Sequence, residues 1–126
     1  MSIFEDQFNF MITAGQVVLY KIKPLYEKLV HEEYKEWDEL TVFDDKVSTE
    51  DVKETVDLIV VATGYLISLL GSAEKAQKAW DLVHATNMAK AEAGQKREDG
   101  KVIQHDEYKQ VLKAKLMADL QELINE

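Results

Sequence analysis

One stretch of the chain, residues 29–40, combines helical spacing with acidic side chains on the helix face that we expect to be buried. Glu32 and Glu36 fall at the centre of the predicted apolar stripe, and Glu33 falls at its margin. A buried carboxylate needs a partner, because removing an isolated charge from water costs many kcal/mol. We therefore expect a divalent cation beside these glutamates. The stripe is marked by Leu25, Leu29 and Leu40.

The composition limits the fold to one helical domain. The chain has 126 residues, enough for a single domain with its own core, of which 46% are hydrophobic and 31% charged. One proline and five glycines leave little room for a many-turned β architecture. The absence of cysteine excludes disulfides, thiolate metal sites and cysteine nucleophiles. We predict one domain over residues 1–126.

The charge and the distribution of apolar residues favour a cytoplasmic protein that binds neither nucleic acid nor membrane. A net charge of −9 argues against nonspecific nucleic-acid binding, which depends on Lys and Arg. The first ten residues lack the basic and apolar regions of a signal peptide. The longest charge-free stretch, residues 58–73, is too short to span a bilayer comfortably.

Capping and turn signals predict four or five helices in an antiparallel, bundle-like all-α domain. Ser2 and Glu5 have capping-box spacing, and Pro24 suits the first turn of a second helix. The third helix is apolar nearly all round over residues 58–70, so we expect it to be the most buried. The helices are expected from Ile3 towards Ala14, from Pro24 to near Thr41, from a Ser48 or Thr49 cap to Gly71, from a Ser72 cap to about Lys90, and from an Asp106 cap to about Ile124.

A second acidic pair lies on the third predicted helix. Glu54 and Asp57 are three residues apart and therefore share a helix face. Ligands that offer only oxygen select hard cations such as Mg²⁺ or Mn²⁺, and Mg²⁺ commonly completes its shell with substrate phosphates. Two acidic helices therefore suggest a phosphorylated substrate that binds through its metal ion.

The order of these acidic residues resembles a known family signature. Glu32-Glu33-Tyr-Lys-Glu36 followed by Glu54-Thr-Val-Asp57 is similar to the EExxE…ExxD motif of the all-α nucleoside triphosphate pyrophosphohydrolases. That superfamily includes MazG, the phosphoribosyl-ATP pyrophosphohydrolases and the dimeric dUTPases. A third block, residues 83–90 with 99–102, resembles the phosphoribosyl-ATP pyrophosphohydrolase-like branch. The resemblance covers roughly residues 5 to 108.

The resemblance implies Mg²⁺-dependent hydrolysis of a nucleoside triphosphate to the monophosphate and pyrophosphate, with Mn²⁺ as a possible substitute. It implies dUTP or dCTP as the first substrates to test, and a homodimer or homotetramer. Glu32 would be the catalytic base or a ligand of a second metal. The implied metal ligands are Glu33, Glu36, Glu54 and Asp57, and the implied substrate-binding residues are Asn87, Lys90 and Lys101.

The residues that recognise the base stay open, and so do two other functions. Aromatic, Met and Gln side chains are candidates for contacting the base, although such residues are more often core. A di-iron carboxylate bundle would need Glu-x-x-His pairs, and the chain offers only Asp81-Leu-Val-His84. A non-enzymatic interaction module would gain no stability from Mg²⁺. The base candidates are Phe8, Phe10, Met11, Gln16, Trp37 and Trp80.

Overall fold

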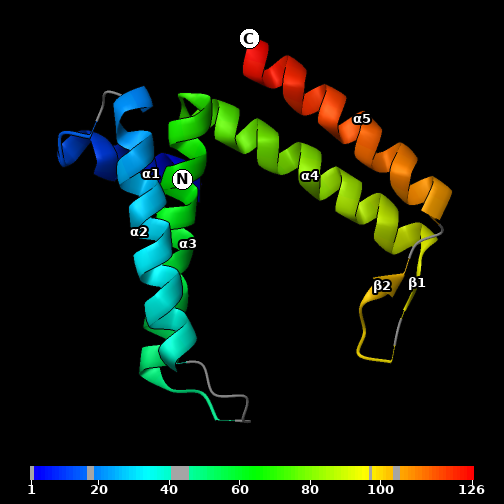
Figure 1. The fold of residues 1–126 in the computed structure, drawn as a ribbon, viewed down its shortest axis with the longest axis horizontal. Coiled ribbons are helices and arrows are strands. Elements are labelled where there is room, and N and C mark those ends of the chain that lie inside the picture. Colours follow the sequence, from blue (N-terminus) through cyan, green and yellow to red (C-terminus); the bar gives the residue numbers. More distant parts are fainter. Residues whose placement is uncertain (1, 17–18, 41–45, 97, 104–105) are drawn as a thin grey trace. The chain divides into compact units, whose positions relative to one another are not determined.

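The computed structural model describes residues 2–16, 19–40, 46–96, 98–103 and 106–126 (Figure 1). It confirms the all-α class, with one short hairpin between the last two helices. The chain divides into two compact units, Met1–Ala76 and Gln77–Glu126. The single domain over residues 1–126 stays a prediction. The elements are α1 (Ile3–Thr13), α2 (Leu19–Leu40), α3 (Thr49–Leu70), α4 (Ala73–Ala93), β1 (Gln95–Lys96), β2 (Val102–Ile103) and α5 (Asp106–Asn125).

Short-range capping signals set several helix ends where the sequence predicts them. The Ser2 hydroxyl accepts a hydrogen bond from the Glu5 N–H at 3.2 Å and caps α1. The Ser48 hydroxyl accepts from the Asp51 N–H at 3.0 Å and caps α3. Gly71 ends α3 in the left-handed region with φ 95°, a conformation that glycine adopts without steric cost. These bonds satisfy backbone groups that a helix end otherwise leaves unpaired.

The predicted start of the second helix is wrong. α2 begins at Leu19, so Pro24 lies inside the helix and not in its first turn. A proline there removes one backbone hydrogen bond from the helix, which favours an end or a kink on local grounds. Ile22 and Tyr26, which are 9% and 1% exposed, lie on either side of the proline. Their burial offsets the missing hydrogen bond. The connector residues 41–45 lie outside the described residues.

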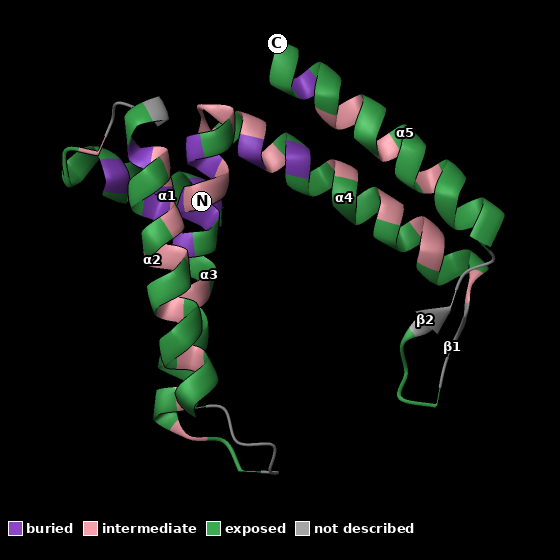
Figure 2. Ribbon diagram, in the orientation of Figure 1, coloured by how far each residue is buried: buried purple, intermediate pink, exposed green. Residues whose placement is uncertain are grey.

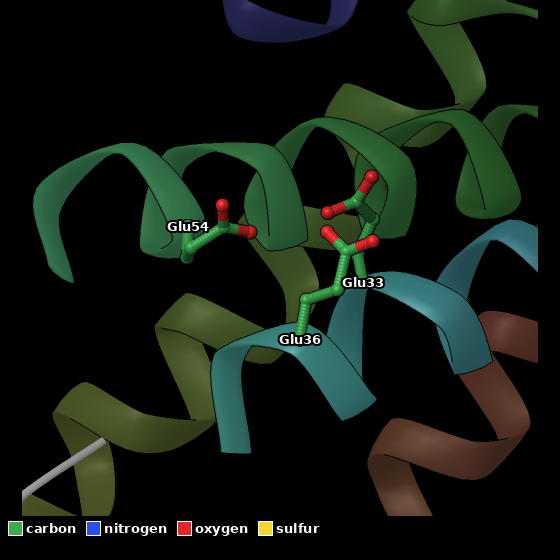
Figure 3. Close-up of side chains that lie close together, drawn as sticks. All are labelled: Glu33, Glu36 and Glu54. Atoms are coloured by element: carbon green, nitrogen blue, oxygen red, sulfur yellow. The ribbon is translucent and has the colours of Figure 1, made fainter. Parts of the chain in front are cut away.

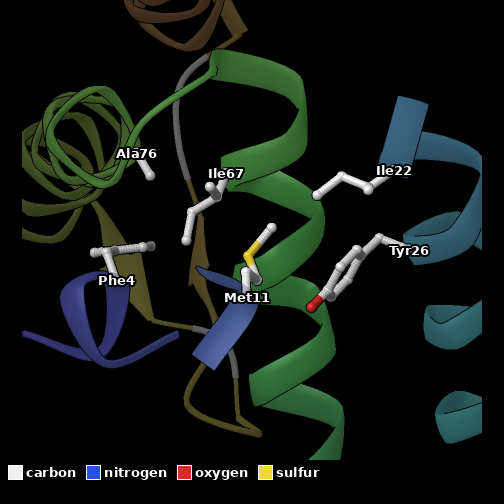
Figure 4. Close-up of a cluster of buried hydrophobic side chains, with 6 residues drawn as sticks. All are labelled: Phe4, Met11, Ile22, Tyr26, Ile67 and Ala76. Atoms are coloured by element: carbon white, nitrogen blue, oxygen red, sulfur yellow. The ribbon is translucent and has the colours of Figure 1, made fainter. Parts of the chain in front are cut away.

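The first unit has a core to which all four of its helices contribute (Figure 4). The core lies where α1 crosses the long α2–α3 pair. Buried side chains gather at that end of the pair in Figure 2. The core side chains are Phe4 and Met11 from α1, Ile22 and Tyr26 from α2, Ile67 from α3 and Ala76 from the first turn of α4.

Tyr26 connects three segments of this unit. Its hydroxyl donates to Gln16 Oε1 at 2.8 Å and accepts from Gln7 Nε2 at 3.0 Å. Its ring lies against the backbone of Gly64 on α3, where an added Cβ would lie 2.7 Å from the ring Cδ1. The glycine therefore lets the tyrosine pack directly onto α3.

α3 is buried on one face only, although its sequence is apolar on nearly every face. Val61, Gly64 and Ile67 are buried, whereas Ile59 and Val60 are 49% and 39% exposed. The burial expected for residues 58–70 is therefore confined to one face of the helix. Within the first unit, α1 and α2 cover only part of the surface of α3.

The second unit consists of the rest of α4, the hairpin and α5. Ala79 and Leu123 are buried there, whereas Trp80 and Val83 on α4 are 54% and 39% exposed. β1 and β2 pair antiparallel, with Lys96 opposite Val102. Asp99 and Gly100 form the turn of the hairpin, where Gly100 has φ 87° and Asp99 Oδ1 accepts from the Lys101 N–H.

The prediction that the longest charge-free stretch is too short to span a bilayer depends on the length and the mean hydropathy of each helix. Among the described residues, no single helix is both long enough and apolar enough to cross a bilayer. α3 and α4 pass that test only when they are taken together as a bent pair.

Candidate metal centre

The buried face of α2 passes through Glu33. Ile22 and Tyr26 are buried, Glu33 is half-buried, and Glu32 and Glu36 are exposed. The prediction that Glu32 and Glu36 occupy the centre of the stripe is therefore wrong. The leucines used to place the stripe are responsible, because Leu25 and Leu40 are 39% and 41% exposed. Starting the stripe at Ile22 and Tyr26 places Glu33 on it two turns later.

α3 brings a second carboxylate to the same place. The Glu54 side chain is only 12% exposed, and that of Asp57 is 33% exposed. Both lie in the first half of α3, which runs beside the second half of α2 (Figure 1). The packing of these two helices therefore determines how close their acidic side chains lie.

Three carboxylates from the two helices converge. Glu33, Glu36 and Glu54 each offer one oxygen, and these oxygens lie within 4.8 Å of one another. The side chains point toward one another across the space between α2 and α3 (Figure 3). Oε2 of Glu33 and Oε2 of Glu54 are buried without a hydrogen-bond partner. Burying a carboxylate oxygen without a partner destabilises the folded protein. A bound cation or a proton would reduce this cost.

Burial and neighbouring charge both act on Glu33. Burial raises the pKa of its carboxyl above the ordinary value, and the nearby carboxylates of Glu36, Asp57 and Glu54 raise it further. Asp57 is therefore close enough for its charge to act on Glu33, although its oxygens are not among the three that converge. Negative charge is therefore concentrated around one half-buried glutamate.

Lys53 lies at the α3 side of the cluster. Its ammonium donates to Asp57 Oδ2 at 2.8 Å and to Glu54 Oε1 at 3.4 Å. These two hydrogen bonds, together with both negative charges, raise the pKa of Lys53. Sequence reasoning missed this residue, although its i, i+4 spacing to Asp57 is the usual signal of a helical ion pair.

The donor set fits a hard divalent cation. All the candidate ligands are carboxylates, and two oxygens with no partner lie within the cluster. Mg²⁺ takes one or two carboxylates and keeps several waters, while Mn²⁺ accepts the same oxygen ligands. Glu33, Glu36 and Glu54 could therefore hold such an ion, with Asp57 beside them. Glu32 is exposed and lies 4.0 Å from the ammonium of Lys28 on the same helix.

The predicted substrate-binding residues lie in the second unit. Asn87 and Lys90 are on α4, where Asn87 is exposed and Lys90 is half-buried. Lys101 is exposed at the hairpin turn, and its N–H donates to Asp99. Their role toward the acidic cluster stays a prediction.

Some candidates for contacting a base have other roles in the structure. Met11 is a core residue at 1% exposure, and Gln16 accepts the Tyr26 hydroxyl. Phe10 is 56% exposed and lines an apolar cavity of about 370 Å³ between α1 and α3. The other lining residues are Ile3, Asp6, Gln7, Val56, Ile59, Val60 and Thr63.

Comparisons with known proteins identify no family for this chain. No family model, curated protein or solved structure matches this chain. The resemblance to the all-α pyrophosphohydrolases therefore depends on the acidic blocks and their spacing.

Proposed function

We propose that this protein is a Mg²⁺-dependent nucleoside triphosphate pyrophosphohydrolase. The observation that carries the proposal is the convergence of Glu33, Glu36 and Glu54 from two helices, with two of their oxygens buried and unpartnered. The spacing of these residues matches the EExxE…ExxD motif. An acidic protein with net charge −9 would bind a triphosphate through a metal ion that bridges the negative charges.

In this proposal Glu33, Glu36, Glu54 and Asp57 hold the metal ion. When bound, Mg²⁺ polarises a phosphoryl oxygen and stabilises the leaving pyrophosphate. The chain contributes a packed pair of helices, since α2 and α3 lie in contact and Ile22, Tyr26 and Ile67 share one buried core. Carboxylates held on packed helices keep a more constant geometry than carboxylates on loops.

Glu32 is our candidate for the base that accepts a proton from the attacking water. It is exposed and belongs to the same helical turn as Glu33 and Glu36. Asn87, Lys90 and Lys101 are candidates for binding phosphate or sugar, because lysine is a point-charge partner for phosphate oxygens. dUTP and dCTP are the first substrates to test, and a homodimer or homotetramer is the proposed assembly.

The proposal is tested by a panel of deoxynucleoside and ribonucleoside triphosphates with Mg²⁺, measuring pyrophosphate separately from orthophosphate. We expect pyrophosphate and the nucleoside monophosphate in equal amounts, and no orthophosphate. Glu33→Gln and Glu54→Gln should each lower kcat/KM by roughly 100-fold or more, because each removes a ligand charge.

Matched controls exist on the same two helices. Glu39 on α2 and Glu50 in the first turn of α3 are exposed and lie outside the cluster. Glu39→Gln and Glu50→Gln should retain wild-type activity. Orthophosphate as the product, or full activity in Glu33→Gln, would contradict the proposal. Absence of hydrolysis together with unchanged thermal stability in Mg²⁺ would favour the interaction module instead.

A further inference from the structure

Lys53 is a cation that the chain itself supplies to the acidic cluster. Its ammonium contacts two of the proposed metal ligands, Asp57 Oδ2 at 2.8 Å and Glu54 Oε1 at 3.4 Å. The lysine side chain is 69% exposed. Solvent can therefore hydrate the ammonium as soon as it leaves the carboxylates.

The oxygens of Glu54 are divided between two environments. Oε1 is bound by Lys53, whereas Oε2 is buried without a partner. The lysine thus neutralises charge on the exposed side of the cluster, while Oε2 of Glu33 and Oε2 of Glu54 keep no hydrogen-bond partner. A divalent ion that binds Glu54 and Asp57 would neutralise the negative charges that attract Lys53. The ion would also repel the ammonium at short range.

We propose that Lys53 is the built-in counter-ion of the metal-free cluster, and that metal binding displaces it from Glu54 and Asp57. This inference depends on the metal site of the proposed function. Part of the free energy of metal binding is then spent on breaking the two lysine contacts. The lysine therefore weakens the affinity for the ion while it stabilises the protein without the ion.

The test is Mn²⁺ binding to the full chain, followed by the loss of the electron paramagnetic resonance signal of free Mn²⁺. Lys53→Met should bind Mn²⁺ about three- to tenfold more tightly than wild type, the range expected for losing one or two partly exposed ion pairs. Its metal-free form should melt at a lower temperature, and Mn²⁺ should raise its Tm by more than it raises that of wild type.

Three variants make the result specific. Lys53→Arg keeps the charge and should remain close to wild type. Lys28→Met removes an exposed lysine that lies 4.0 Å from Glu32, outside the cluster, and controls for the change in net charge. Glu33→Gln should lose Mn²⁺ binding, which assigns the signal to the cluster.

Two results would overturn the displacement of Lys53, and only the second would also overturn the metal centre. If wild type binds Mn²⁺ through Glu33 but Lys53→Met binds with equal or weaker affinity, the displacement is wrong and the metal centre stands. If wild type binds no Mn²⁺, the metal centre and the displacement are both wrong.

Discussion

At the scale of single residues, Glu33 determines the properties of the acidic cluster. Its Oε2 is buried without a partner, and its carboxyl has a raised pKa because of burial and three neighbouring carboxylates. In the unfolded chain the same carboxyl is hydrated and titrates near its ordinary value. Folding without metal is therefore penalised once this group is ionised.

The sign of the pH effect follows from the raised pKa. Below about pH 4.5, the ordinary pKa of a glutamate, both states are protonated and Glu33 has no effect. As the pH rises through the window between the unfolded and the raised folded pKa, the unfolded state loses its proton first. The metal-free protein therefore loses stability, and the loss is complete above the folded pKa.

Glu33→Gln should therefore stabilise the metal-free protein at pH 7 by about 1 kcal/mol, because it removes the buried charge. The gain should shrink toward zero near pH 4.5. Urea unfolding in EDTA at the two pH values measures it, with Glu39→Gln as the control. An equal difference at both pH values would mean that the ionisation of Glu33 is not the cause.

How far the sequence predicts the site depends on which residues mark the helix face. The two acidic helices, and Glu33 and Glu54 as candidate metal ligands, followed from the motif. Placing the buried stripe of α2 through Leu25 and Leu40 put its centre at the wrong residues, because both leucines are exposed. Relief of the repulsion between the carboxylates is therefore expected from Glu33→Gln more than from Glu36→Gln, because Glu33 is the more buried of the two.

At the scale of helices, the ends that depend on local capping residues were predicted better than the ends that depend on packing against other helices. Ser2, Ser48 and Gly71 act on backbone groups within a few residues, so their roles can be inferred without the fold. Pro24 could not be placed in the same way, because its position inside α2 depends on packing against other helices. The hairpin was missed because two-residue strands carry no periodic pattern.

The close packing of α2 on α3 gives a prediction at this scale. Gly64→Ala should destabilise the protein by about 1–3 kcal/mol, because the new Cβ would overlap the Tyr26 ring. This cost outweighs the gain of about 1 kcal/mol that alanine brings to an ordinary helix position. Denaturant unfolding of both single variants and the double variant with Tyr26→Leu measures the coupling. If Gly64→Ala costs the same in the wild-type background and in the Tyr26→Leu background, the ring is not the obstacle.

At the scale of the whole molecule, apolar surface remains exposed on the first unit. Phe10, Val56 and Ile59 are 56%, 51% and 49% exposed, and they line the cavity between α1 and α3. Contiguous apolar surface of this kind often marks a site where another protein binds. The all-α class could be predicted from composition, whereas the number of subunits could not, because an apolar helix face is the same sequence pattern in either case.

We expect the purified protein to be a dimer or tetramer, because self-association would cover these side chains. Light scattering after size-exclusion chromatography measures the mass. Val56→Asp combined with Ile59→Asp should shift the mass toward the monomer of 14.5 kDa without loss of helical circular dichroism. Lys113→Asp, at an exposed position on α5 outside the cavity lining, is the charge-matched surface control. A monomeric wild-type protein would contradict the proposed assembly.

The most direct test of the central claim is anomalous diffraction from crystals grown with Mn²⁺. We predict a Mn²⁺ peak between α2 and α3, about 2 Å from carboxylate oxygens of Glu33, Glu36 and Glu54. The same data from Glu33→Gln crystals should lack the peak. A peak confined to other acidic residues, or no peak at saturating Mn²⁺, would contradict the metal centre.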